Sequence, residues 1–124
     1  MRIFGLQHVG MPTKCFDKTI KFYEDLGFTS DYSTINGKSR VNFLSLGNLQ
    51  LEIYEESRPA MTAGAIDHLS LDVDDIHEVK TFVESIGLTV EKPGIETLPF
   101  FKKGVSFFKV IGPNKETLEF NQIN

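Results

Sequence analysis

The sequence contains little cysteine, no strongly basic segment and no long apolar run. Cys15 is the only cysteine among 124 residues, so the chain can form no internal disulfide, which suits a reducing compartment. The net charge is −4 and the longest basic run is Lys102-Lys103, so the basic stripe typical of nucleic-acid-binding proteins is missing. No apolar run reaches the roughly 18 residues of a membrane span, and the first residues lack the apolar core of a secretion signal. We therefore expect a soluble, cytoplasmic protein that binds neither nucleic acid nor membrane.

Phosphate-binding loops are also missing. The glycines in "LSLGN" and "IGPNK" indicate turns, and neither segment matches a P-loop or a dinucleotide-binding fingerprint. Hydrophobic residues make up 40% of the chain and charged residues 24%, which are ordinary values for a globular protein. A chain of this length is expected to form one domain, residues 1–124, with a substantial core.

The chain contains an internal repeat. The segment "LQHVGMPTKCFDKTIKFYEDLGF", residues 6–28, aligns without a gap with "IDHLSLDVDDIHEVKTFVESIGL", residues 66–88. The alignment places His8 opposite His68, and it also matches the apolar positions and a glycine near the end of each segment. Two such copies in a chain this short indicate a duplicated module within one domain.

The similarity continues beyond these segments. "VNFLSLGNLQLEIYE", residues 41–55, parallels "VSFFKVIGPNKETLEFNQ", residues 105–122, with a longer turn in the second copy. We therefore expect a first module over residues 1–56 and a second over residues 65–124. Residues 56–64, "ESRPAMTAG", have the composition of a linker between them.

Each module shows the same order of patterns. Apolar residues at helical spacing predict helices over 14–26 and 75–86, with Asp74 as the expected N-cap of the second helix. Alternating segments predict strands at 5–11, 28–34, 39–46 and 49–55 in the first copy, and at 65–73, 88–93, 104–111 and 116–122 in the second. The predicted fold is α+β, with two tandem β-α-β-β-β modules that form a curled, open, eight-stranded mixed sheet.

Four polar side chains are predicted on the face of the sheet turned away from the helices. In the first strand the apolar residues Val9 and Met11 point to the face that meets the helix, so His8 points to the face turned away from it. The alternation of residues 49–55 places Glu52 on that same outer face. By the same reasoning the second copy contributes His68 and Glu119 to this face.

These four residues point to a metal site. Each glutamate alone could simply face solvent across a one-sided sheet. The repeat, however, matches histidine with histidine and glutamate with glutamate, and charged side chains are seldom buried unpaired. Two imidazoles and two carboxylates are a suitable ligand set for a divalent ion such as Zn, Ni, Co, Mn or Fe. We therefore predict a metal site formed by His8, Glu52, His68 and Glu119.

The duplicated modules, the two matching segments that contain the histidines and the ending "FFKVIGPNKETLEFNQ" resemble the vicinal oxygen chelate (glyoxalase / bleomycin resistance / dioxygenase) superfamily over essentially the whole chain. The four ligand positions of that superfamily map onto His8, Glu52, His68 and Glu119. A complete His/Glu/His/Glu set is most similar to glyoxalase I, the lactoylglutathione lyase. Epimerases of the superfamily usually have glutamine at the second position, fosfomycin-resistance enzymes and dioxygenases use three ligands, and the metal-free binders generally lack the set.

The resemblance implies a metal-dependent lyase or isomerase. One divalent ion would use its two open positions to bind a small substrate with vicinal oxygens, and a proton would move through a metal-chelated enediolate. Glu119 is the implied base, with Glu52 across the metal. The substrate could be a thiol conjugate, and the implied assembly is a homodimer whose chains can share sites. The alternatives are an epimerase, a fosfomycin-type thiol transferase, or a metal-free protein that binds a small molecule.

Other residues are weaker candidates. Basic side chains that could hold the carboxylates of a glutathione conjugate are available, but the sequence does not place them near the site: Arg40, Arg58, Lys102 and Lys103. Phe100 and Phe101 are interpreted as core or subunit-contact residues, with pocket lining as the alternative. His77 is expected on the surface, and Cys15, at the start of the first helix, has no visible partner base.

Overall fold

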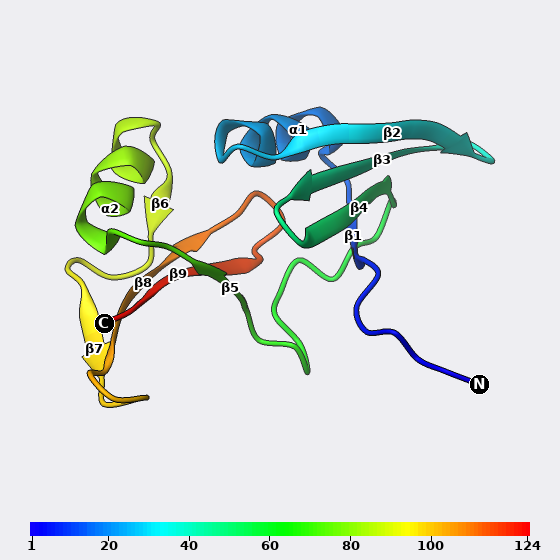
Figure 1. The fold of residues 1–124 in the computed structure, drawn as a ribbon. Helices are drawn as coiled ribbons and strands as arrows, with labels where there is room; N and C mark the ends of the chain where they lie inside the picture. Colours follow the sequence, from blue (N-terminus) through cyan, green and yellow to red (C-terminus); the bar gives the residue numbers. More distant parts are fainter. The chain divides into compact units, whose positions relative to one another are not determined.

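The structure is a computed structural model that describes residues 1–124 and contains two compact units, Met1–Ala60 and Met61–Asn124 (Figure 1). Each unit contains one helix and one sheet, and each corresponds to one copy of the repeat. None of the helices has both the length and the apolar character needed to cross a membrane.

The first unit is a β-α-β-β-β module. Its elements are β1 (Val9–Thr13), α1 (Phe16–Asp25), β2 (Thr29–Asn36), β3 (Ser39–Leu46) and β4 (Leu49–Glu55). The strand order in the sheet is β1-β4-β3-β2, in which β1 runs parallel to β4 and the other neighbours are antiparallel. The strand that begins just after His8 is therefore an edge strand, and its one neighbour is the strand that contains Glu52.

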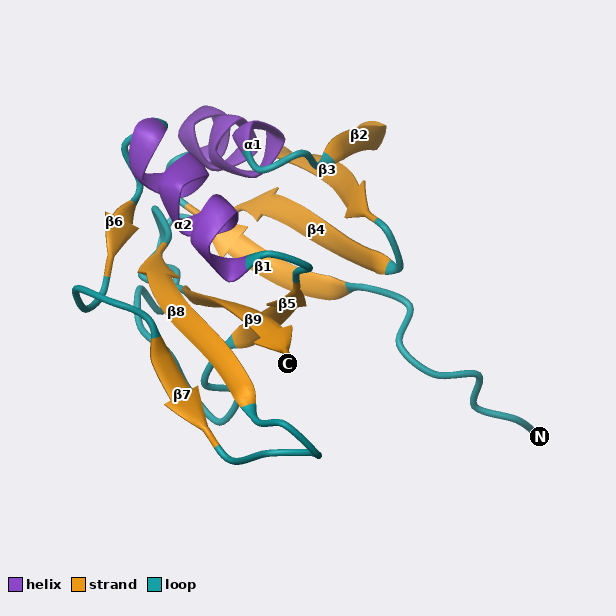
Figure 2. Cartoon of the chain, turned by 60° about the vertical axis from the view of Figure 1, so that its left-hand side comes forward, coloured by secondary structure: helices purple, strands orange, loops and turns teal.

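The core of the first unit lies between this sheet and α1, which covers one face of it (Figure 2). Leu51 and Ile53 of β4 are fully buried, as is Tyr23 of α1, whose hydroxyl donates a hydrogen bond to the sulfur of Met11. Because side chains alternate along a strand, Glu52 lies on the face opposite to Leu51 and Ile53. The predicted alternation in this strand is confirmed.

The second unit repeats the plan with an additional strand. Its elements are β5 (Leu69–Asp72), α2 (Ile76–Ser85), β6 (Thr89–Val90), β7 (Glu96–Leu98), β8 (Val105–Ile111) and β9 (Thr117–Ile123). The strand order is β5-β9-β8-β6, with β7 also paired to β8, and β5 runs parallel to β9. Val110 and Leu118 are buried, and the rings of Phe108 and Phe120 stack with centroids 5.2 Å apart.

The strand predicted over residues 88–93 is observed only as the two-residue β6, Thr89–Val90, and β7, Glu96–Leu98, lies beyond the predicted range. Pro93 has no backbone N–H to donate to a neighbouring strand, and Gly94 adopts a positive φ of 85°. This Pro-Gly pair ends β6, and pairing with β8 resumes only at β7.

The strands that follow the two histidines start later than predicted. The predicted strands 5–11 and 65–73 are observed as Val9–Thr13 and Leu69–Asp72. Each is an edge strand with one neighbour, and the exposed segment that precedes β1 runs away from the first sheet (Figure 1). Each histidine therefore lies immediately before its strand.

The N-cap of α2 also differs from the prediction by one residue. Asp75, rather than Asp74, has the extended backbone of a cap, and its carboxylate accepts hydrogen bonds from the N–H groups of His77 and Glu78. The sequence alone does not show which of two adjacent aspartates is the N-cap. In the structure the buried residue Ile76 is the first residue of the helix, so Asp75 takes the N-cap position.

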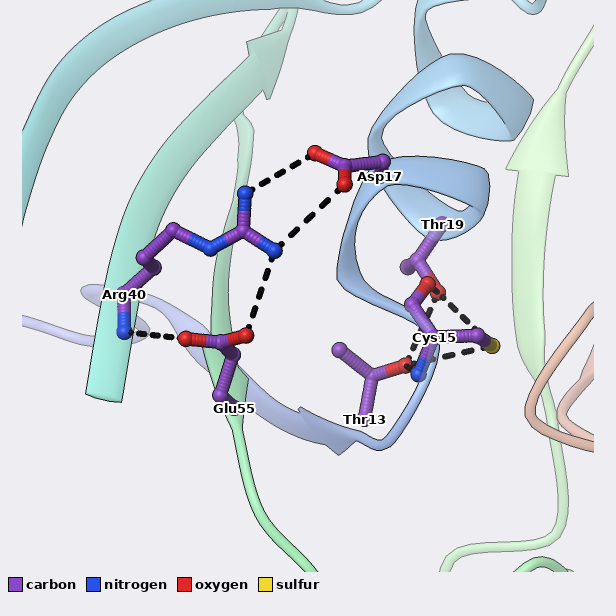
Figure 3. Close-up of polar contacts among 6 residues, drawn as sticks. All are labelled: Thr13, Cys15, Asp17, Thr19, Arg40 and Glu55. Carbon is purple, nitrogen blue, oxygen red and sulfur yellow. Dashed lines mark hydrogen bonds and ion pairs between the residues drawn. The ribbon is translucent and has the colours of Figure 1, made fainter. Parts of the chain in front are cut away.

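Arg40 joins α1 to the sheet of the first unit (Figure 3). Its guanidinium binds Asp17 of α1 at 3.0 Å and Glu55 of β4 at 3.2 Å, and it lies over the ring of Phe16. The hydrogen bond from this guanidinium lowers the pKa of Glu55 and, reciprocally, raises the pKa of Arg40. Arg40 is one of the basic residues considered for binding the carboxylates of a substrate, and in this structure its guanidinium binds two carboxylates of the chain.

Cys15 lies in a hydrogen-bonded corner at the start of α1 (Figure 3). Its backbone N–H donates to the hydroxyl of Thr13 at 2.9 Å, and its carbonyl accepts from the hydroxyl of Thr19 at 2.9 Å. Both threonines are fully buried, and the thiol lies within hydrogen-bonding range of both hydroxyls. Cys15 is the N-cap residue of α1 by position, its side chain makes no capping hydrogen bond, and the contacts described here are with Thr13 and Thr19.

Two glycines with the same backbone conformation give a matched test of packing in the second unit. Gly87 and Gly104 both have φ of 81°, but an added Cβ meets nothing at Gly87, whereas at Gly104 it would lie 2.9 Å from the carbonyl oxygen of Leu98. We expect Gly87→Ala to cost about 1–2 kcal/mol of unfolding free energy from the backbone conformation alone. Gly104→Ala should cost roughly 1–3 kcal/mol more because of the clash. Equal losses in urea unfolding of the two variants would contradict the packing described for the β7–β8 turn.

Candidate metal centre

The first unit brings His8 and Glu52 together. Glu52 lies in the middle of β4 opposite Gly10 of β1, so the histidine just before β1 reaches the same face of the sheet. The Nε2 atom of His8 is 3.5 Å from Oε1 of Glu52, and both side chains are about one-third exposed, at 32% and 29%. The Nδ1 atom of His8 hydrogen-bonds to the side-chain oxygen of Gln7 at 3.0 Å, and the ring packs edge-on against Phe43.

The second unit forms the equivalent pair. Glu119 lies opposite Ser70 in the parallel register of β9 and β5, and His68 lies just before β5. The Nε2 atom of His68 is 3.8 Å from Oε2 of Glu119. Its Nδ1 atom hydrogen-bonds to the carboxylate of Asp67 at 2.8 Å, and this bond lowers the pKa of Asp67.

Glu119 is buried and has two further partners. Only 8% of the residue is exposed, and its Oε2 atom accepts hydrogen bonds from the Ser70 hydroxyl at 2.7 Å and from the Asn121 amide at 3.2 Å. A buried carboxylate is costly unless such donors satisfy it. Sequence reasoning missed Ser70 and Asn121, although a signal was present: each lies two residues from a predicted ligand and therefore on the same face of its strand.

Each pair fits half of a divalent-ion site. The Nδ1 atom of each histidine is bound to the preceding residue, which leaves Nε2 directed to the glutamate, and metal-bound histidines usually hydrogen-bond in this way through their second nitrogen. Two ligand atoms that are each about 2.1 Å from one ion lie roughly 3–3.5 Å apart. The nitrogen–oxygen distances of 3.5 and 3.8 Å are close to that range, so a small side-chain adjustment would suffice.

The structure shows two pairs rather than a four-ligand cluster. It contains no group of three or more His, Cys, Asp or Glu side chains with metal-binding spacing, so the four-ligand set stays a prediction. The third histidine, His77, is exposed in the first turn of α2.

The two aromatic residues of the β7–β8 turn contradict one part of the sequence interpretation, a place in the core, while a subunit contact stays a prediction. Phe100 and Phe101 are 54% and 74% exposed, so their assignment to the core is wrong. An open hollow of about 510 Å³ adjoins this turn and is lined partly by Phe101, Lys102 and Lys103. Neither member of the His68–Glu119 pair lines this hollow.

Comparison with solved structures supports the fold. A glyoxalase family protein from Enterococcus faecalis is 26% identical, with a TM-score of 0.82, and the match covers 98% of this chain and 99% of that one. An integron cassette protein from the mobile metagenome of the Halifax Harbour sewage outfall is 26% identical, with a TM-score of 0.73 and coverage of 98% and 100%. The fosfomycin resistance protein FosX from Listeria monocytogenes, in complex with Mn(II) and sulfate, shares the fold at 16% identity, with a TM-score of 0.75 and coverage of 99% and 95%.

Sequence comparison identifies the family. No curated protein matches the chain significantly. The family model described as the Glyoxalase/Bleomycin resistance protein/Dioxygenase superfamily matches residues 5–96, most of the chain, including every helix and strand of the first module and the histidine of the second. The chain belongs to the Glyoxalase/Bleomycin resistance protein/Dioxygenase superfamily.

Proposed function

We propose that the protein is a metal-dependent lyase or isomerase similar to glyoxalase I, in which His8, Glu52, His68 and Glu119 hold one divalent ion. The observation that carries the proposal is the repetition of one arrangement in both units. In each unit a histidine just before the parallel edge strand faces a glutamate on the neighbouring strand, with its second nitrogen bound to the preceding residue. Two such pairs supply the nitrogen and oxygen ligands that a divalent transition-metal ion accepts.

The proposed chemistry divides between the ion and the chain. A bound divalent ion would supply Lewis-acid stabilisation of negative charge on two adjacent substrate oxygens. Glu119 acts as the base: its carboxylate takes the proton from the carbon next to the substrate carbonyl and returns it to the neighbouring carbon. Its hydrogen bonds from Ser70 and Asn121 keep this carboxylate in one orientation. Glu52 is the second glutamate of the site.

The proposed substrate is a small molecule with vicinal oxygens, and a hemithioacetal is the leading class. The proposed assembly is a homodimer. Nothing in the site excludes a related reaction of the superfamily, so the same experiment must separate an epimerase and a thiol transferase from the glyoxalase type.

The test uses the wild-type protein after separate incubation with Zn²⁺, Ni²⁺, Co²⁺, Mn²⁺ and Fe²⁺. Each sample is assayed with the hemithioacetal of glutathione and a 2-oxoaldehyde, with an epimerisable acyl thioester, and with an epoxide antibiotic plus a thiol. We expect hemithioacetal turnover that depends on the added ion. If the protein takes up metal but turns over only the acyl thioester or the epoxide, the proposed glyoxalase-type reaction is wrong and the reaction of that substrate takes its place. If the protein takes up no metal from any of these solutions, the proposed enzyme function is wrong, and the remaining alternative is a metal-free protein that binds a small molecule.

A further inference from the structure

The two histidine–glutamate pairs differ in the groups that hold the glutamate. Ser70 and Gly10 occupy equivalent positions, each opposite its glutamate in the parallel register, but only Ser70 has a hydroxyl. Asn121 lies two residues after Glu119, and Tyr54 takes the corresponding place after Glu52. The donors that hold one glutamate are therefore absent around the other.

We propose that Ser70 and Asn121 are positioning residues that preorganise Glu119 for metal binding, so that the pair in the second unit is the tighter half of the site. The inference rests on the proposed function, because it assigns roles around the ion proposed there. It also assigns Glu52 the more mobile role, since the one polar contact of its carboxylate in the structure is with the imidazole of His8, at 3.5 Å.

Burial and hydrogen bonding support this difference. The side chain of Glu119 is 10% exposed and accepts two hydrogen bonds, whereas that of Glu52 is 29% exposed and has its histidine as a partner at 3.5 Å. Glu119 therefore loses its rotamer freedom when the chain folds, and Glu52 retains freedom that a bound ion would have to remove.

The two hydrogen bonds to Glu119 share one oxygen of its carboxylate. Ser70 and Asn121 both donate to Oε2 of Glu119, and neither donates to Oε1. Oε2 is also the oxygen that lies 3.8 Å from Nε2 of His68, so the two donors fix the carboxylate at the oxygen that faces the histidine. Outer hydrogen-bond partners that orient ligating residues in this way typically change metal affinity by about 10–100-fold when they are removed.

The test measures the affinity of the metal-free protein for Co²⁺ by competition with a chromophoric chelator, together with the visible absorption of the bound ion. We expect Ser70→Ala and Asn121→Ala to bind Co²⁺ about 10–100-fold more weakly. Ser70→Thr keeps the hydroxyl and should restore the affinity and the wild-type spectrum. A role in folding alone would lower the melting temperature of the metal-free variants without changing Co²⁺ affinity.

A substitution in the first unit provides the reverse test. An added Cβ at Gly10 would lie 3.8 Å from Oε1 of Glu52 and 3.7 Å from the ring of Tyr54, so it fits without displacing either side chain. Gly10→Ser should place a hydroxyl beside Glu52 and tighten Co²⁺ binding, whereas the matched control Gly10→Ala should not. This variant keeps the inference testable if Ser70→Ala fails to fold.

The outcomes separate the two proposals. If the wild-type protein binds Co²⁺ and the Ser70 and Asn121 variants bind it equally well, the inference is overturned and the proposed function stands. The inference is also overturned if Gly10→Ser and Gly10→Ala have the same affinity. A wild-type protein that binds no ion overturns the proposed function and, with it, the inference.

Discussion

Replacement of His68 by alanine should remove the bound metal ion. The wild-type protein is expected to retain about one divalent ion per chain after incubation and desalting, because in the proposed site both histidine–glutamate pairs contribute ligands. His68→Ala deletes a nitrogen ligand and leaves the buried carboxylate of Glu119 facing an empty position. Loss of one ligand of four should lower affinity by at least the 10–100-fold that follows loss of an outer partner. Mass spectrometry of untagged protein measures the metal content directly.

The matched control for this variant is His77→Ala. His77 is the third histidine of the chain, and it is exposed in the first turn of α2, outside both pairs. His77→Ala should therefore keep the wild-type metal content, and His8→Ala should lose it as His68→Ala does. If both His68→Ala and His8→Ala keep the wild-type metal content, the ion is bound elsewhere and the four-ligand site is wrong.

Replacement of Glu119 by glutamine should have the largest effect on turnover. Glutamine has nearly the same shape, and its amide oxygen can still accept the hydrogen bonds from Ser70 and Asn121, but it cannot take a proton at neutral pH. Removal of a general base typically lowers kcat by about 10²–10⁴-fold. The measurement is kcat on the hemithioacetal substrate at saturating metal.

Two further variants show whether this loss is specific. Glu78→Gln changes an exposed carboxylate on α2 and should leave kcat unchanged. Glu52→Gln tests the other glutamate of the site and is expected to lower kcat less than Glu119→Gln. Metal content is measured in parallel, because a glutamine variant that loses the ion would lose activity for that reason alone. Full activity of metal-loaded Glu119→Gln would show that another group is the base.

The features of the fold that could be predicted are those encoded by repeated, local patterns. The match of two segments that each contain a histidine predicted two modules of the same type, and alternation predicted β3 and β4 to the residue. Features that depend on one or two residues were harder. Asp74 and Asp75 are equivalent N-cap candidates until the first helical residue is known. The strand predicted at 88–93 is shorter than expected, and the short strand β7 after Pro93-Gly94 was not predicted.

The candidate site was predicted in part for the same reason. The alternation of β4 and β9 places Glu52 and Glu119 opposite the buried apolar residues, as expected, and the structure adds which histidine each glutamate faces. The difference between the pairs could not be predicted, because it depends on cross-strand register. Only the parallel pairing of β5 with β9 brings Ser70 opposite Glu119. The assembly of the four residues into one site stays a prediction.

The parallel pairing of the edge strands has a consequence for the order of folding. Val9 pairs with Leu51 and Leu69 with Leu118, so these contacts close loops of more than 40 residues, whereas the antiparallel hairpins of each sheet close short ones. Long loops are slow to close, and β1 and β5, like the opposite edge strands β2 and β6, are held by one neighbour only. Each histidine therefore meets its glutamate late in folding, and transient fraying of a single strand would dissolve the pair while the rest of the sheet persists. A ligand that binds both members of the pair would stabilise that strand against local opening. Amide exchange should then slow there more than anywhere else in its unit.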